Sequence, residues 1–144
     1  MINTSEINEA RKQIDKLNKE SKKVIVVAKD DEFNRKILEN KKVNGILGLE
    51  FFRKDKLKQR DSGLNEHLCK LARENNIEIL IDLDKIRSLS EKEKAETLSR
   101  IVQNIDLCKR TRTKVSFLNK YKKQDVFSFF LTFNGSTEQA KRAV

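Results

Sequence analysis

Short apolar runs alternate with longer amphipathic segments along this chain, and this alternation is what most constrains its fold. The first run, residues 23–28, is continuous and rich in β-branched residues, which is typical of a strand covered on both faces. Strands that are separated by helices form right-handed βαβ units and hence a parallel sheet. The sequence therefore predicts an α/β fold with strands at residues 23–28, 45–50, 77–83 and 113–118.

The length of the chain limits how much of a barrel it can form. A complete (β/α)8 barrel needs about 250 residues, whereas this chain has 144. We therefore expect a partial TIM-barrel-like fold, an incomplete β/α barrel or open sheet of about four or five mostly parallel strands flanked by helices. We expect one α/β domain over residues 1–144, with a helix within residues 1–22 and βα units in 23–144.

Capping residues indicate where the helices begin. Residues 126–133 are ambiguous, because their composition favours a strand while their apolar positions also fit one helix face. We favour a helix ending at Asn134-Gly135 and a capping box from Ser136 to Gln139; an aromatic-rich hairpin is the alternative. The other expected helix starts are Thr4 or Ser5, Asp30 or Asp31, Asp61 or Ser62, and Ser90 with Glu93.

The chain carries far more basic than acidic side chains. It has 32 Lys and Arg against 22 Asp and Glu, for a formal net charge of +10. Most of the excess lies in residues 53–60 and 107–144. Lys and Arg near phosphates release condensed counterions, so the excess favours a polyanionic partner. A lysine-rich soluble protein without such a partner is the alternative.

Several short motifs occur in a common order. The most specific is Asp61-Ser62-Gly63-Leu64-Asn65, preceded by basic residues and followed by Leu68-x-x-Leu71-Ala72-x-x-Asn75. Residues 103–110 and 135–141 add two weaker matches. In this order and spacing the motifs resemble the archaeal and eukaryotic ribonuclease P protein subunit called component 3. The chain departs from that family in having Glu66 where a His is usual, and it has no counterpart of the first βα units, so it resembles a shortened member.

The resemblance implies a function without catalysis by the protein. The family is a barrel-like scaffold that binds the catalytic RNA of ribonuclease P and assists it in 5′ maturation of precursor tRNA. The implied partners are ribonuclease P RNA, a small RRM-like protein subunit and precursor tRNA within the complex. The protein itself is expected to bind no cofactor, and Mg²⁺ is expected with the RNA.

The basic zones supply the candidate RNA-binding residues. A cationic loop at the carboxyl end of the sheet, beside the start of a helix, favours phosphate. Residues 110–123 flank the fourth expected strand, where they would extend the same face; a solvated basic loop is the alternative. The expected RNA-binding residues are Arg53, Lys54, Lys56, Lys58, Arg60, Ser62, Gly63, Arg110, Arg112, Lys120, Lys122 and Lys123.

Two other functions remain open from the sequence. Glu50, Asp82 and Asp84 follow expected strands, where three carboxylates would hold Mg²⁺ in a small nuclease. The alternative for these acids is ion pairing with nearby lysines and arginines. A general basic RNA-binding protein is the other reading. The single His excludes a His-rich metal site.

The cysteines and the hydropathy bear on the compartment. Cys69 and Cys108 are far apart and lie at apolar helical positions, so we expect two buried thiols in a reduced, cytoplasmic protein. No apolar run approaches the roughly 20 residues that span a bilayer, and the N-terminal residues lack the apolar stretch of a secretory signal. No membrane partner is expected.

Overall fold

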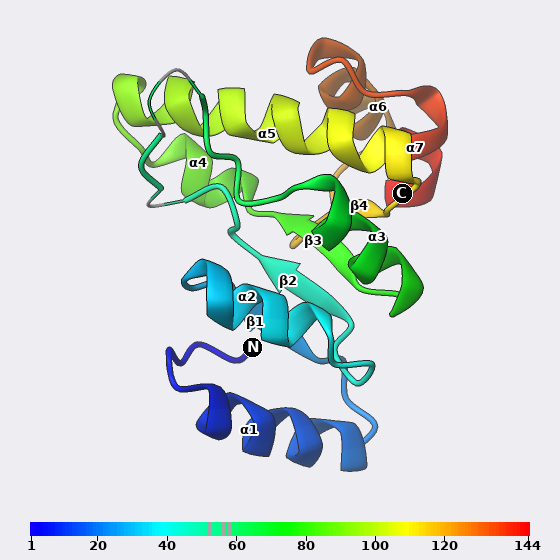
Figure 1. Ribbon diagram of the computed structural model, residues 1–144. Coiled ribbons are helices and arrows are strands. Elements are labelled where there is room, and N and C mark those ends of the chain that lie inside the picture. The colour runs from blue at the N-terminus through cyan, green and yellow to red at the C-terminus, as the bar shows by residue number, and fades with distance from the viewer. Residues whose placement is uncertain (52, 56, 58) are drawn as a thin grey trace.

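Four short parallel strands form one sheet in the computed structural model, which describes residues 1–51, 53–55, 57 and 59–144 (Figure 1). The strands pair in chain order, β1-β2-β3-β4, as expected for successive βαβ units. The α/β fold with a partial, barrel-like parallel sheet is therefore confirmed. The strands are β1 Ile25–Val27, β2 Gly45–Leu47, β3 Glu78–Ile81 and β4 Val115–Phe117.

A row of buried apolar side chains crosses all four strands. In the observed register Val26 lies beside Ile46, Ile46 beside Ile79, and Ile79 beside Val115. All four side chains belong to the main hydrophobic core. Since a one-residue slip would turn each of them to the other face, burial of this row fixes the register.

Helices connect and cover the strands, and several of them begin after a side-chain cap. The expected cap of the first helix at Thr4 or Ser5 is wrong, because that helix follows Glu6, which forms no side-chain cap. Asp30, Asn65, Ser90 and Ser136 each accept a hydrogen bond from a first-turn N–H. The short helix α4 was not expected from the sequence. The helices are α1 Ile7–Lys19, α2 Asp31–Leu38, α3 Glu66–Glu74, α4 Leu83–Arg87, α5 Glu91–Thr111, α6 Lys123–Thr132 and α7 Thr137–Ala143.

The expected start of the third helix is wrong. Helix α3 begins at Glu66 and is capped by Asn65, whose Oδ1 accepts from the Leu68 N–H at 2.8 Å. The Asp61 carboxylate is occupied instead by Arg53 and by the Gly63 N–H. The Ser62 hydroxyl is buried and lies 3.4 Å from the Leu64 N–H. Residues 61–64 therefore form a loop held by its own polar contacts.

The N-terminal residues extend the sheet beyond β1. The Ile2 N–H donates to the Ile25 carbonyl and the Val27 N–H donates to the Ile2 carbonyl, both at 2.8 Å. This pairing is a single parallel bridge to Val26, with α1 as the connection. The outer side of β1 is thus partly covered by the chain's own first residues.

The expected helix is confirmed, since residues 126–132 lie within α6 and Phe133 follows as its C-cap. The rings of Phe129 and Phe130 on α6 meet the Phe117 ring of β4 edge-on, with centroids 5.1 and 5.9 Å away. This face of α6 therefore packs against β4 through edge-to-face aromatic pairs. The predicted capping box of Ser136 and Gln139 is also confirmed at the start of α7.

The expectation for the two cysteines is confirmed as far as their burial is concerned. Cys69 on α3 and Cys108 on α5 are both fully buried, with their Sγ atoms 3.9 Å apart. They pack between the two helices as small apolar groups. Among the described residues, no helix is long and apolar enough to cross a membrane.

Truncating the centre of the aromatic cluster tests how much it stabilises the fold. Phe130 is fully buried, so Phe130→Ala should lower the free energy of unfolding by about 3–5 kcal/mol. Leu131, its neighbour on α6, is exposed, so Leu131→Ala should change that free energy by no more than about 0.5 kcal/mol. Urea denaturation followed by circular dichroism measures both; equal losses would contradict the packing described here.

Candidate nucleic-acid interface

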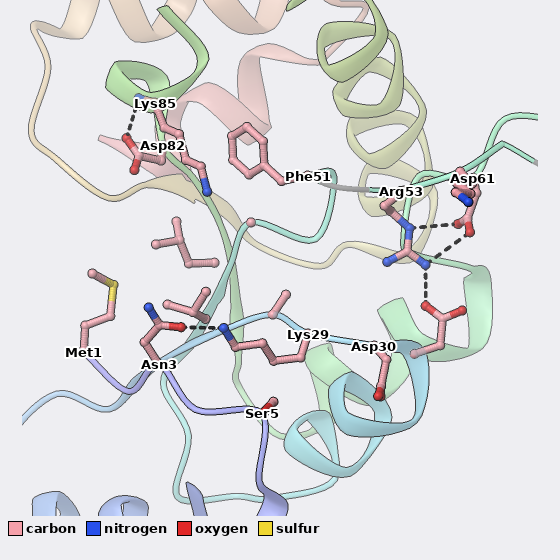
Figure 2. A pocket seen from close by; sticks show the side chains of 16 residues that line it. Met1, Asn3, Ser5, Lys29, Asp30, Phe51, Arg53, Asp61, Asp82 and Lys85 are labelled. Atoms are coloured by element: carbon pink, nitrogen blue, oxygen red, sulfur yellow. Dashed lines mark hydrogen bonds and ion pairs between the residues drawn. The ribbon is translucent and has the colours of Figure 1, made fainter. Parts of the chain in front are cut away.

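The carboxyl ends of β1, β2 and β3 open into a cleft of about 900 Å³ (Figure 2). Its floor includes Val27 and Leu47 from the ends of β1 and β2, and its wall includes the first residues of the chain. Lys29, Lys54 and Lys85 line it together with four aspartates. The carboxyl ends of parallel strands are the usual ligand-binding side of α/β sheets.

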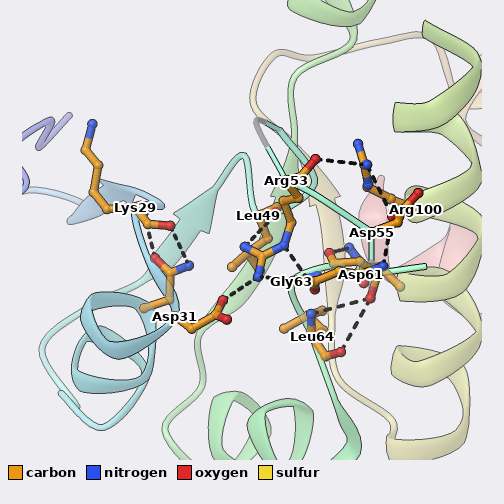
Figure 3. A network of polar contacts seen from close by, with 12 residues as sticks. Lys29, Asp31, Leu49, Arg53, Asp55, Asp61, Gly63, Leu64 and Arg100 are labelled. Carbon is orange, nitrogen blue, oxygen red and sulfur yellow. Dashed lines mark hydrogen bonds and ion pairs between the residues drawn. The ribbon is translucent and has the colours of Figure 1, made fainter. Parts of the chain in front are cut away.

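A largely buried arginine, Arg53, joins the loop that borders this cleft to helix α2. Arg53 pairs with Asp61 through Nε at 3.1 Å and also with Asp31 on α2 (Figure 3). Its side chain is only 9% exposed. Both carboxylates neutralise the guanidinium, so Arg53 joins the loop to α2 and its charge is not free for a ligand.

Helix α5 fixes the same loop from the other side. Arg100 is buried, and its Nη2 donates to the Arg53 carbonyl at 3.0 Å and to Asp55 at 3.2 Å. Asn104, one turn further along α5, donates from Nδ2 to the Ser62 carbonyl at 3.0 Å. Because these contacts come from buried side chains, the described residues of the loop are anchored to the core.

Gly63 is required where it stands. Its φ of +87° lies in the left-handed region, and a Cβ there would come within 2.5 Å of the Leu49 carbonyl oxygen. Only glycine avoids both problems. Ser62 and Gly63 are both buried, so they shape the loop and do not form its outer surface.

A second hollow of about 420 Å³ lies between α2, this loop and α3. Arg35 of α2, Arg60 of the loop and His67 of α3 are exposed and line it. Arg60 keeps 40% of its side chain exposed and meets Asp55 only at 3.6 Å. Sequence reasoning missed Arg35, since nothing in the α2 sequence indicates that the 59–65 loop folds against it.

The second basic zone divides between the two ends of the sheet. Lys120, Lys122 and Lys123 are exposed and follow β4, on the same end as the cleft. Arg110 and Arg112 come before β4 and lie at its amino end, so the expectation that they extend the same face is wrong. The direction of β4 makes this separation unavoidable. Lys56 and Lys58, also expected in the site, lie outside the described residues.

The three carboxylates of the nuclease alternative do not form a metal site. Asp82 caps α4 by accepting from the Lys85 N–H at 3.1 Å, and Asp84 accepts from Asn119 at 2.9 Å and from Tyr121 at 3.3 Å. Glu50 is buried. Among the described residues, no group of three or more His, Cys, Asp or Glu side chains is placed to hold a metal ion.

Glu50 is an unusual buried acid. Its Oε1 has no hydrogen-bond partner, and its side chain is fully enclosed. Burial raises the pKa of Glu50 from 4.5 to about 7, against the opposing effects of its own backbone N–H and of Lys85. The carboxyl is thus largely protonated below neutral pH. Lys85 lies 4.3 Å over the ring of Phe51.

Comparison with known proteins finds a likeness in structure but none in sequence. No protein-family model and no curated protein matches the sequence. The structure resembles a chain in a cryo-EM structure of archaeal ribonuclease P with mature tRNA, with a TM-score of 0.80 and 20% sequence identity. The alignment covers 98% of this chain and 61% of that chain, so this chain spans about three fifths of its length. The two chains share one fold.

The buried acid makes stability depend on pH in a defined direction. The unfolded chain ionises Glu50 near pH 4.5, whereas the folded protein keeps it protonated up to about pH 7. The unfolded state therefore binds fewer protons over this interval, and stability falls as the pH rises through it. At about 1.36 kcal/mol for each pH unit, the loss is roughly 3 kcal/mol.

Glu50→Gln should remove that loss. Its free energy of unfolding should match that of the unaltered protein near pH 4.5 and exceed it by up to roughly 3 kcal/mol above pH 7. Urea denaturation at a series of pH values measures the difference. Glu39→Gln, at an exposed position, is the control. A Glu50→Gln profile parallel to that of the unaltered protein would show that Glu50 is ionised when folded.

Proposed function

We propose that this chain is an RNA-binding protein subunit of ribonuclease P, of the component 3 family. The observation that carries the proposal is the likeness of nearly the whole chain to a chain of an archaeal ribonuclease P that was solved with mature tRNA. The motifs of residues 61–75 support the same family independently of the fold. An RNA partner is also what the net charge of +10 favours.

The cations at the carboxyl end of the sheet are suited to phosphate. Lys54, Lys120 and Lys122 are exposed, and in the described part of the chain none of them forms an ion pair. The counterions that drive binding are condensed on the RNA, and a cation without an acidic partner is free to neutralise a phosphate and release them. Flexible lysines do not read base edges, so we infer recognition of RNA shape and backbone.

In this proposal the protein positions the RNA and does not cut it. Glu50 is buried, while Asp82 and Asp84 are engaged in hydrogen bonds, which argues against their use as metal ligands. Cleavage of precursor tRNA would then belong to the RNA and its Mg²⁺. The small RRM-like subunit and precursor tRNA are the proposed partners within the complex, and the cytoplasm is the proposed location.

Removing the free cations at the carboxyl end should weaken RNA binding in a salt-dependent way. The variant with Lys54→Gln, Lys120→Gln and Lys122→Gln loses up to three phosphate contacts. Each contact contributes about 0.7–0.9 to the slope of log affinity against log salt, so the slope should become shallower by about two to three. Filter binding to ribonuclease P RNA over a range of salt concentrations measures this slope.

An equal change of charge elsewhere is the control. Lys12, Lys16 and Lys19 lie exposed on α1, and their replacement by Gln removes the same charge from another surface. This α1 control variant should alter the slope much less. Equal effects of the two variants would mean that RNA senses only the net charge, as for a general basic RNA-binding protein.

Identity of the RNA is tested in the protein's own cells. The native protein should copurify with ribonuclease P RNA, and the purified material should cleave precursor tRNA at its 5′ end. Recovery of a mixture of RNAs, without enrichment of ribonuclease P RNA or that cleavage activity, would remove the family assignment.

A further inference from the structure

A third cavity lies at the opposite end of the sheet from the cleft. It has a volume of about 470 Å³ and lies between the last turn of α5 and helix α7, which Figure 1 shows side by side. Of the described residues that line it, three are cationic and one, Glu138, is acidic. We call Lys109, Arg112 and Arg142 the amino-end triad.

The fold brings the triad together from segments far apart in the chain. Helix α5 runs back along the sheet and ends at Thr111, so that Lys109 and Arg112 lie beside the amino end of β4. Helix α6 runs back in the same way and places the turn into α7 at this end. Gln139 of α7 donates from its buried side chain to the Ile105 carbonyl at 3.0 Å, which fixes α7 against α5.

Neutral groups hold the triad in place. Lys109 reaches across to the α6–α7 turn and donates from Nζ to the Asn134 carbonyl at 3.0 Å. Arg142 reaches back from α7 and donates from Nη1 to the Arg112 carbonyl at 3.1 Å. Each of these bonds uses one N–H of a side chain that has three or five. The remaining N–H groups and the full positive charges are left for another acceptor.

Two other cations near this end of the sheet have acidic partners. Arg110 pairs with Asp106 at 3.2 Å, and Lys114 pairs with Glu78 at 2.7 Å. No acid of the described residues lies within ion-pair distance of any member of the triad. Glu138 is the one described acid that lines the cavity, and it pairs with none of the three cations, so their positive charges repel one another and a bound anion relieves that repulsion.

We propose that the amino-end triad binds the phosphate backbone of RNA. The inference rests on the proposed function, since it takes the polyanion to be RNA. Arginine forks bind phosphate oxygens in pairs and a lysine adds a point charge, so the set is suited to phosphodiester groups. The protein would then contact RNA at both ends of its sheet, and it would hold two segments of one folded RNA in a fixed relation.

Arg112→Gln is the cleanest test of the triad. Among the described residues, the Arg112 side chain has no hydrogen-bond or ion-pair partner. Its backbone carbonyl, which accepts the hydrogen bond from Arg142, remains in the variant. Loss of this phosphate contact should make the salt slope of RNA binding shallower by about one. The triple variant with Lys109→Gln, Arg112→Gln and Arg142→Gln should change the slope by about two to three. Unchanged slopes would overturn the proposal.

Controls separate this proposal from the proposed function. Circular dichroism and thermal unfolding check that the Arg112→Gln protein is folded as before, and the α1 control variant accounts for net charge. The variant with Lys54→Gln, Lys120→Gln and Lys122→Gln provides the comparison. If it loses RNA binding while both triad variants retain it, the triad proposal fails and the proposed function stands. If the unaltered protein does not bind ribonuclease P RNA, both fail.

A second measurement distinguishes RNA from a free phosphate ligand. Amide shifts of residues 109–112 and 136–142 are followed by NMR during titration with tripolyphosphate and, separately, with ribonuclease P RNA. Shifts with RNA that are absent in the triple variant support the proposal. Shifts with tripolyphosphate alone would overturn it and assign the cavity to a small phosphorylated ligand.

Discussion

Parallel pairing of very short strands is the constraint on which this structure depends. Each strand has three or four residues, so a pair of strands alone buries little surface. The row from Val26 through Ile46 and Ile79 to Val115 is buried only because helices cover it. Since every strand points the same way, the loops that follow strands gather at one end of the sheet and those that follow helices at the other.

That separation decides which charges work together. In the sequence, residues 107–144 form one basic zone, but β4 divides it. Lys120 and Lys122 join Lys54 at the carboxyl end, whereas Arg112 joins Lys109 and Arg142 at the amino end. The proposed binding of folded RNA relies on this arrangement of cations at both ends of the sheet.

Buried arginines show why the site was only partly predictable. Arg53 and Arg100 look like surface cations in the sequence, yet each is largely enclosed and holds the 53–65 loop through acids and carbonyls. Their partners lie up to 47 residues away, so no local pattern indicates them. For the same reason the start of α3 was predicted too early: Asp61 resembles a cap, but its carboxylate is taken by Arg53.

The sequence by itself determined the fold class, the order of the strands and most helices, and the excess of positive charge, and it favoured a helix within residues 126–133 over a hairpin. These follow from local periodicity and capping, which act over a few residues. Only the tertiary structure decided which cations remain free, which carboxylates are buried or engaged, and how Lys109, Arg112 and Arg142 meet. Such properties depend on burial and on partners distant in the chain, and these exist only after the helices have packed against the sheet.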